Sequence, residues 1–238
     1  MRARQRHLQW RDKCGLYLDS RYIDQSNATE VVTWPDRSGN NRNQSNGTAN
    51  QRPIYIKNSI GGNGVVEFDG SNDRLGGGSS VNWYQYVTAF FVAQTDDTTG
   101  VKGQYVFWDG NTNTGGASFH FGILYGKTTF WGKGWNNAAG PYAKSDGFTP
   151  GGMGSWMIGS AELGAASNVW ENGISPSAKT TANSSLTNAT YTFNIGYENF
   201  WPFDGKIALV AIFTDVLNAS IRKRYEQCAG YSFKLACS

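Results

Sequence analysis

Short apolar segments alternate along the chain with turns rich in Gly, Asn and Asp, a pattern typical of antiparallel β proteins. The most apolar segment covers residues 87–94 and predicts a central strand with both faces covered. Residues 203–213 predict a second long core strand. The dipeptide Asn172-Gly173 fits a type I′ turn, so it predicts a hairpin after a strand at residues 168–170.

Shorter strands and two loops complete this interpretation. The other predicted strands cover residues 15–19, 31–34, 54–56, 65–68, 105–108, 118–125, 128–131, 155–161, 190–196 and 231–235. We expect the last of these to close a sheet beside the first. Residues 40–52 are polar and residues 132–152 are rich in Gly and Asn, so both are expected to be loops.

One helix is predicted near the end of the chain, with Asn218 as its N-cap. Its basic face is expected to consist of Arg222, Lys223 and Arg224. Residues 1–13 are interpreted as a basic N-terminal arm and residues 14–238 as one domain. The predicted fold is all-β: a two-sheet antiparallel jelly-roll sandwich with one short C-terminal helix.

Composition supports a sandwich of this size. The 238 residues are 39% hydrophobic and 14% aromatic, enough to fill a core between two sheets. Charged residues make up only 16%, which argues against a helical bundle. No apolar run approaches the roughly 18 residues that a membrane span needs, so no membrane span is expected.

Charge is concentrated in the arm. The net charge is +3, and five of the 21 basic residues but one of the 18 acidic residues lie in residues 1–13. The nearly neutral body argues against nucleic-acid binding by the folded domain. The arm could contact nucleic acid, an acidic partner surface or nothing, and we favour a solvated arm or one docked on a neighbouring subunit. It has no apolar h-region, so we expect no secretory signal peptide. The chain is then either an intracellular product or leaves the cell by another route, and we favour a place on a virion or another released particle.

The chain has three cysteines, Cys14, Cys228 and Cys237. A disulfide scaffold needs more cysteines and an even number of them, so this class of protein is excluded. Cys14 could approach Cys228 or Cys237. We favour buried free thiols, because no export signal places the chain in an oxidising compartment.

Several short sequence blocks follow one another in a characteristic order. They lie at residues 15–19, 34–40, 51–53, 66–73, 168–173, 195–196, 203–207 and 217–218. In this order they resemble bacterial and viral laminin-G-like domains of the concanavalin A-like lectin/glucanase superfamily, over residues 14–238. The resemblance implies a jelly-roll sandwich and favours recognition of sugars or surfaces over catalysis, although this fold hosts many functions.

Catalytic signatures are missing from the sequence. Glucanases of this superfamily typically carry Glu-x-Asp-x-x-Glu on one strand, and this chain has no such segment. Glu67 and Asp69 share a strand face, but the family element that they match is structural. His120, the only histidine outside the arm, could orient a ligand or pack in the fold. The protein is therefore not expected to be an enzyme, and a divergent glycan hydrolase is the weakest alternative.

Two aromatic clusters are candidates for sugar binding, because sugar C–H faces stack on aromatic rings and polar edges bind hydroxyls. Both are expected on loops or strand ends. The alternative is that these rings cap the core or pack on a neighbouring subunit. The predicted ligand-binding residues are Trp131, Trp135, Asn136, Tyr142, Tyr197, Asn199 and Trp201.

No cofactor is expected to be required, but Ca²⁺ has a candidate site. Asp109, Asn111 and Asn113 place hard oxygen ligands at alternating positions of one loop, and Asp96-Asp97 is a second candidate. The loop lacks the Gly and Glu of an EF-hand, and ordinary turn chemistry is the alternative.

The sequence therefore predicts a non-enzymatic recognition or adhesion module that binds carbohydrate, displayed in several copies on a larger assembly such as a virus or phage particle. The alternative is a structural or decoration protein of a virion that uses the sandwich for protein–protein contacts. The expected partner is a glycan or a particle-surface protein.

Overall fold

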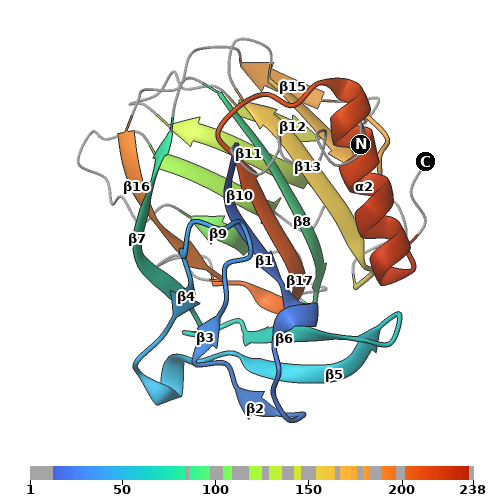
Figure 1. Cartoon of the computed structure of the whole chain (residues 1–238). Coiled ribbons are helices and arrows are strands. Elements are labelled where there is room, and N and C mark those ends of the chain that lie inside the picture. The colour runs from blue at the N-terminus through green and yellow to red at the C-terminus, as the bar shows by residue number, and fades with distance from the viewer. Residues whose placement is uncertain are drawn as a thin grey trace, which may run out of the picture.

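The structure is a computed structural model that describes residues 13–83, 86–96, 104–108, 118–124, 129–135, 142–145, 154–163, 167–175, 179–182, 189–196 and 202–235. Two antiparallel sheets lie face to face, and one helix packs on the outer side of the first sheet (Figure 1). The all-β sandwich with one C-terminal helix is confirmed.

The first sheet, sheet A, has eight strands. Seven follow the order β14 (Asn168–Glu171), β13 (Met157–Leu163), β8 (Val87–Thr95), β17 (Asp204–Phe213), β6 (Asn63–Asp69), β5 (Ile54–Ile60) and β2 (Thr29–Glu30). The eighth, β1 (Cys14–Asp19), pairs with β17. β17 is therefore central, with β8 along one edge and β6 and then β1 along the other.

The second sheet, sheet B, has nine strands. Their order is β15 (Lys179–Ala182), β12 (Tyr142–Ser145), β11 (Thr129–Trp135), β10 (Ser118–Leu124), β9 (Gln104–Trp108), β16 (Ala189–Ile195), β7 (Leu75–Trp83), β4 (Gln44–Ser45) and β3 (Thr33–Trp34). Two short 3₁₀ helices, η1 (Ser20–Tyr22) and η2 (Ala49–Gln51), lie in the connections.

The core explains why β8 is apolar along its whole length. Phe91 faces sheet B, where its ring lies 5.0 Å from that of Phe121 in a T-shaped contact. Phe90 lies on the opposite face and packs on Phe213 and on Tyr225 of the helix. Because both faces of β8 are covered, adjacent residues are buried, as the sequence predicted.

The helix α2 (Ala219–Phe233) begins as predicted, with the Asn218 side chain accepting a hydrogen bond from the backbone N–H of Ile221 at 3.1 Å. The strand predicted over residues 231–235 is wrong, because the helix continues to Phe233 and ends with Lys234 in the left-handed region. Its buried residues have helical spacing: Arg222, Glu226, Gly230 and Phe233. The expected basic face is also wrong at Arg222, which is buried against sheet A.

The loop predicted over residues 132–152 is wrong, because its first residues extend β11 and a further strand, β12, follows. The loop predicted over residues 40–52 contains β4 and η2. The Asn172-Gly173 turn is confirmed: both residues have positive φ, 49° and 83°, as a type I′ turn requires.

Two of the cysteines are free thiols, as the sequence favoured. Cys14 is buried, but Cys228 is exposed on α2, so the expected burial holds for only one of them. Cys237 lies outside the described residues. Within the described ranges, no helix is long and apolar enough to cross a membrane.

Candidate functional site

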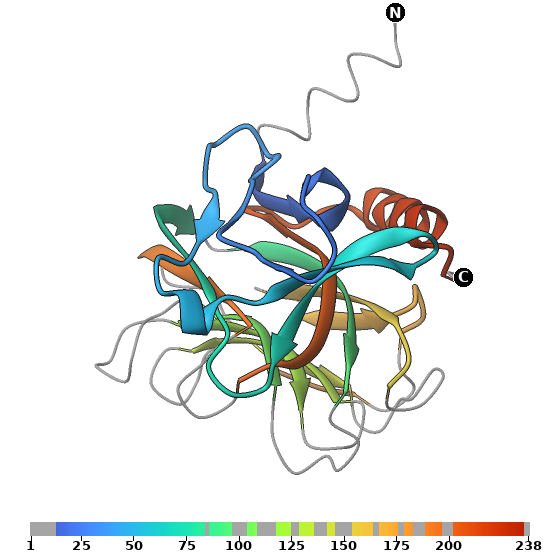
Figure 2. The ribbon, with the colours of Figure 1, turned by 90° about the horizontal axis from the view of Figure 1, so that it is seen from below.

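Strand β10 defines the two faces of sheet B. Phe121 and Ile123 are buried in the core between the sheets. Successive strand residues belong to opposite faces, so His120 and Gly122 occupy positions on the outer face. Figure 2 shows α2 (red) and the central strands of sheet B (yellow-green) on opposite sides of the molecule, with sheet A between them.

A row of outer-face positions crosses sheet B through His120. On one side His120 is opposite Trp108 of β9, which is opposite Asn194 of β16. On the other side it is opposite Lys133 of β11, which is opposite Tyr142 of β12. Directly opposed residues of antiparallel strands share a face, so all five positions lie on the outer face.

A second row runs parallel to the first, through Gly122. Its neighbours are Tyr105 of β9 and Trp131 of β11, and Trp131 is opposite Lys144 of β12. Neighbouring strands lie about 4.8 Å apart, so the row from β9 to β12 covers about 14 Å. The two rows together bring aromatic and cationic positions onto one face.

Three of the predicted ligand-binding residues, Trp131, Trp135 and Tyr142, thus share one face of sheet B. They were expected on loops or strand ends, but Trp131 lies inside β11 and is paired on both sides, which corrects that expectation. The other four, Asn136, Tyr197, Asn199 and Trp201, lie outside the described residues.

Sequence reasoning missed Trp108 and Lys144 as members of this face. A signal was present in β11, whose sequence Thr-Phe-Trp-Gly-Lys-Gly-Trp alternates small and large residues. Gly132 and Gly134 are opposite Phe121 and Phe119 and belong to the inner face. From Trp131 to Trp135, large residues therefore occupy the outer-face positions of a strand whose glycines suggested a loop.

The two sheets differ sharply in acidic residues. The nine described strands of sheet B contain neither Asp nor Glu. The strands of sheet A contain seven: Asp19, Glu30, Glu67, Asp69, Glu162, Glu171 and Asp204. Catalysis by carboxylates would therefore have to use sheet A or the loops, so the partners of the sheet A carboxylates matter.

One carboxylate cluster lies between β13 and α2. Arg222 binds Glu226 at 2.5 Å, lies 3.8 Å from Glu162, and stacks 3.7 Å from the ring centre of Trp170. Ser160 donates a hydrogen bond to Glu226. Burial raises the pKa of Glu162 to about 7 against the lowering effect of Arg222. Glu226, on the side of α2 that faces sheet A, is only 1% exposed, and the cluster fixes α2 on sheet A.

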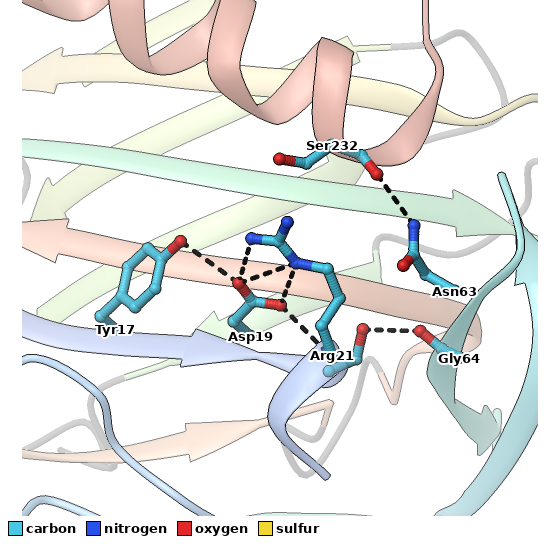
Figure 3. Close-up of polar contacts among 7 residues, drawn as sticks. Tyr17, Asp19, Arg21, Asn63, Gly64 and Ser232 are labelled. Carbon is cyan, nitrogen blue, oxygen red and sulfur yellow. Dashed lines mark hydrogen bonds and ion pairs between the residues drawn. The ribbon is translucent and has the colours of Figure 1, made fainter.

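A second buried carboxylate, Asp19, joins β1 to η1 (Figure 3). Arg21 donates hydrogen bonds to it through Nε at 2.9 Å and Nη2 at 2.6 Å, and Tyr17 donates one at 3.3 Å. Burial and the charge of Asp19 raise the pKa of Tyr17. Arg21 also lies 5.2 Å from the ring centre of Phe233, so the cluster ties the first strand to the end of α2.

The family-like block at residues 34–40 is a structural turn. Asp36 accepts hydrogen bonds from the backbone N–H groups of Tyr17, Ser38 and Arg42 at 2.9 to 3.0 Å, and one from the Ser38 hydroxyl at 2.7 Å. Asn40 donates to the carbonyl of Cys14 at 2.7 Å. These contacts hold the turn against β1.

The block at residues 66–73 has the same role. Asp69 accepts hydrogen bonds from three successive backbone N–H groups of its own turn. Glu67 lies 3.0 Å from Lys206 on the neighbouring strand β17, and Lys206 also binds Asp96 at 2.7 Å. Each carboxylate of the Glu67–Asp69 pair therefore has its own structural partners, in line with the structural role expected for this element.

Carboxylate, imidazole and thiol groups are also the natural ligands of a metal ion. The described part of the chain has no group of three or more His, Cys, Asp or Glu side chains placed to hold one. Asp109, Asn111 and Asn113 lie outside the described residues, so the Ca²⁺ site stays a prediction.

No protein-family model matches the chain, and a search of curated proteins found no similar sequence. Solved structures do share the fold. Domain 4 of AbnA, an extracellular GH43 arabinanase from Geobacillus stearothermophilus, in complex with arabinotriose, is similar with a TM-score of 0.58 and 18% identity. The match covers 87% of this chain and 95% of that domain.

Toxin binding domains are similar as well. The binding domain of botulinum neurotoxin serotype D in complex with N-acetylneuraminic acid matches with a TM-score of 0.62 and 13% identity, over 93% of this chain and 52% of the toxin domain. The binding domain of Paraclostridial Mosquitocidal Protein 1 matches with a TM-score of 0.62 and 11% identity, over 93% and 53%. The chain spans about half of each toxin domain. At these identities the likeness concerns the fold.

Proposed function

We propose that this protein is a non-enzymatic carbohydrate-recognition module whose glycan-binding site is the outer face of sheet B. The main observation behind this proposal is the register of the strands. It places the positions of Tyr105, Trp108, Trp131 and Tyr142 on one face of the sheet around Gly122. Stacking on such rings is the usual way in which proteins bind sugar C–H faces.

Two of the similar structures are complexes with sugars, arabinotriose and N-acetylneuraminic acid. They support a sugar ligand for a sandwich of this shape, although fold alone does not assign one. We extend the proposed site to Asn136, Tyr197, Asn199 and Trp201, which the sequence predicts as ligand-binding residues and which lie outside the described residues.

The non-enzymatic part of the proposal is supported by the partners of the sheet A carboxylates. Asp19 binds Arg21, Asp69 binds backbone groups, and Glu67 binds Lys206. Outside the strands of sheet A, Asp36 also binds backbone groups, and Glu226 of α2 is buried. A retaining or inverting glycosidase needs two carboxyl groups that flank a bound sugar. The described strands of sheet B supply none.

We further propose that the chain is a laminin-G-like domain of the concanavalin A-like superfamily. The roles of Asp36 and Asp69 in holding two family-like turns support this assignment. Display on a virus or phage particle, docking of the arm and the virion-structural alternative stay predictions, because neither the described fold nor the similar structures bear on them.

The test is a glycan-array screen of the whole chain beside the variant W131A/W135A. The matched control is Y231A, which removes an aromatic ring that is 90% exposed on α2. We expect binding in the wild type and in Y231A, and its loss in W131A/W135A with unchanged thermal unfolding. Equal binding by all three proteins, or no binding by the wild type, would contradict the proposal.

Two added arms test the remaining parts. Repeating the screen with a chelator tests the Ca²⁺ prediction at Asp109, Asn111 and Asn113, because a metal that orders the site would make binding chelator-sensitive. Incubating the protein with a polysaccharide panel and measuring new reducing ends tests the absence of hydrolysis. Release of reducing ends that survives in E67Q would indicate an enzyme that uses carboxylates other than Glu67.

A further inference from the structure

The cations of the outer face of sheet B stand among aromatic positions. Lys133 of β11 is opposite Tyr142 of β12, and Trp131 of β11 is opposite Lys144 of β12. The four positions form a two-by-two arrangement in which each lysine has an aromatic residue across from it and another beside it along the strand. His120 is opposite Lys133 on the other side.

No described strand of sheet B provides an acidic partner for these cations. Lys206 of sheet A shows the contrast, because Glu67 is directly opposite it and 3.0 Å away. The positions directly opposite Lys133 are His120 and Tyr142, and those opposite Lys144 are Trp131 and Thr180. The two lysines occupy diagonal positions on neighbouring strands, which are about 7–8 Å apart at the backbone.

We propose that this face selects acidic oligosaccharides, whose carboxylate or sulfate groups bind between Lys133 and Lys144 while a neighbouring sugar ring stacks at Trp131 or Tyr142. This inference rests on the proposed function and adds its ligand class. An anion between two lysines relieves their repulsion and gains charge-assisted hydrogen bonds. The adjacent aromatic positions favour an acidic sugar over a free anion, because only the sugar has a ring that can stack on them.

Nucleic acid is the other polyanion that stacks on aromatic rings. It is disfavoured by the small number of cations, because such binding depends on neutralising many phosphates. The described strands of sheet B contain three lysines, Lys133, Lys144 and Lys179, and no arginine. A single-stranded oligonucleotide therefore serves as a competing probe.

The experiment measures the dissociation constants of four probes by calorimetry: trigalacturonate for a carboxylate, a sulfated trisaccharide, arabinotriose as a neutral sugar, and a short single-stranded oligonucleotide. The proteins are the wild type, K133Q/K144Q and the control K57Q/K223Q, which removes two exposed lysines elsewhere. Thermal unfolding of each protein verifies that it is folded. Each titration is repeated at low and high salt.

We expect the wild type to prefer an acidic trisaccharide over arabinotriose at least tenfold, with weaker binding at high salt. K133Q/K144Q should lose that preference and its salt dependence while keeping any binding of arabinotriose, and K57Q/K223Q should behave as the wild type. The two acidic probes distinguish carboxylate from sulfate recognition. A K133Q/K144Q protein that keeps the preference would overturn the inference.

Failure of the inference and failure of the proposed function give different results. Equal binding of arabinotriose and both acidic probes overturns acid selectivity but leaves a glycan-binding face. Absence of binding to every sugar, in the array as well, overturns both. Tighter binding of the oligonucleotide than of either acidic sugar assigns the face to nucleic acid and overturns both.

Discussion

The outer faces of the two sheets use charge in opposite ways. On sheet A, α2 covers the face, and Arg222 lies between Glu226 and Glu162 with its charge compensated in the interior. On sheet B, Lys133 and Lys144 stand among aromatic positions on described strands that carry no carboxylate. A charge whose partner is built into the fold serves stability, whereas for the two lysines of sheet B we propose a ligand as the partner.

The same division holds for the turns. The turn at residues 34–40 contains one carboxylate, Asp36, and the block at residues 66–73 contains three, Glu67, Asp69 and Asp73. In the structure the oxygens of Asp36 and Asp69 accept hydrogen bonds from nearby backbone groups. We therefore expect substitutions on the sheet A side to change the free energy of unfolding, and substitutions on the outer face of sheet B to change binding.

The largest expected effect is that of R222A. Removing the guanidinium leaves the buried Glu226 side chain without its ion-pair partner, and breaking a buried ion pair in this way typically costs about 3–5 kcal/mol of unfolding free energy. Chemical denaturation measures this loss, with K223A on the exposed face of α2 as the control, expected to change stability by less than about 0.5 kcal/mol. If R222A is as stable as K223A, the buried cluster does not hold the helix.

A smaller loss is expected for D36A. Its carboxylate accepts four hydrogen bonds, three of them from backbone N–H groups that the alanine leaves unsatisfied. We expect about 2–3 kcal/mol of destabilisation by denaturant titration, with glycan affinity unchanged in the folded fraction. A variant that keeps full stability but loses binding would place the site at this turn and break the comparison between the sheets.

We expect Glu162 to make the free energy of unfolding change with pH. In the unfolded chain this carboxyl loses its proton near its ordinary pKa of 4.5, but in the fold burial raises the pKa, so it keeps the proton until about pH 7. Its stabilising contribution is therefore complete below pH 4.5 and is lost as the pH rises through 7, by on the order of 1–3 kcal/mol.

In the variant E162Q, the unfolding free energy should no longer show the decrease with rising pH that Glu162 causes, when it is measured from about pH 4.5 to about pH 8. Burial also raises the pKa of Asp73, to about 6, so the difference between wild type and variant isolates Glu162. Parallel curves for the two proteins would show that Glu162 titrates normally.

The smallest effect is expected for N218A, which removes the N-cap of α2. The lost hydrogen bond to the Ile221 N–H should cost about 1 kcal/mol, seen as a lower thermal midpoint. N218S should recover most of the loss, because serine is also a good N-cap. No recovery by serine would indicate that the amide contributes through another contact.

The sequence predicted the elements whose pattern is local. The apolar run of β8, the Asn172-Gly173 turn and the Asn218 cap each depend on neighbouring residues, and each is found as predicted. The end of α2 was mispredicted because Tyr231 and Phe233 favour strands, and helical packing on sheet A overrode that preference.

The candidate site could be predicted only in part, for a physical reason. Trp131 and Trp135 each lie two residues from Lys133 in the same strand. The alternation of side chains along a strand is therefore enough to place these three residues on one face. Trp108 and Lys144 join them only through the register of β9 with β10 and of β11 with β12. That register depends on pairing between distant segments, and the glycines of β11 concealed the strand itself.

The most direct test of the division between the sheets is to follow the tryptophan indole N–H signals of the ¹⁵N-labelled protein by NMR during titration with trigalacturonate and then with arabinotriose. We expect the signals of Trp131, Trp135 and Trp108 to shift, with the larger shifts for the acidic sugar. Trp34, buried in the core, and Trp170, beneath Arg222 on sheet A, should stay in place. Sugar binding that moves Trp170 or Trp34 and leaves Trp131 and Trp108 unchanged would contradict a glycan site on the outer face of sheet B.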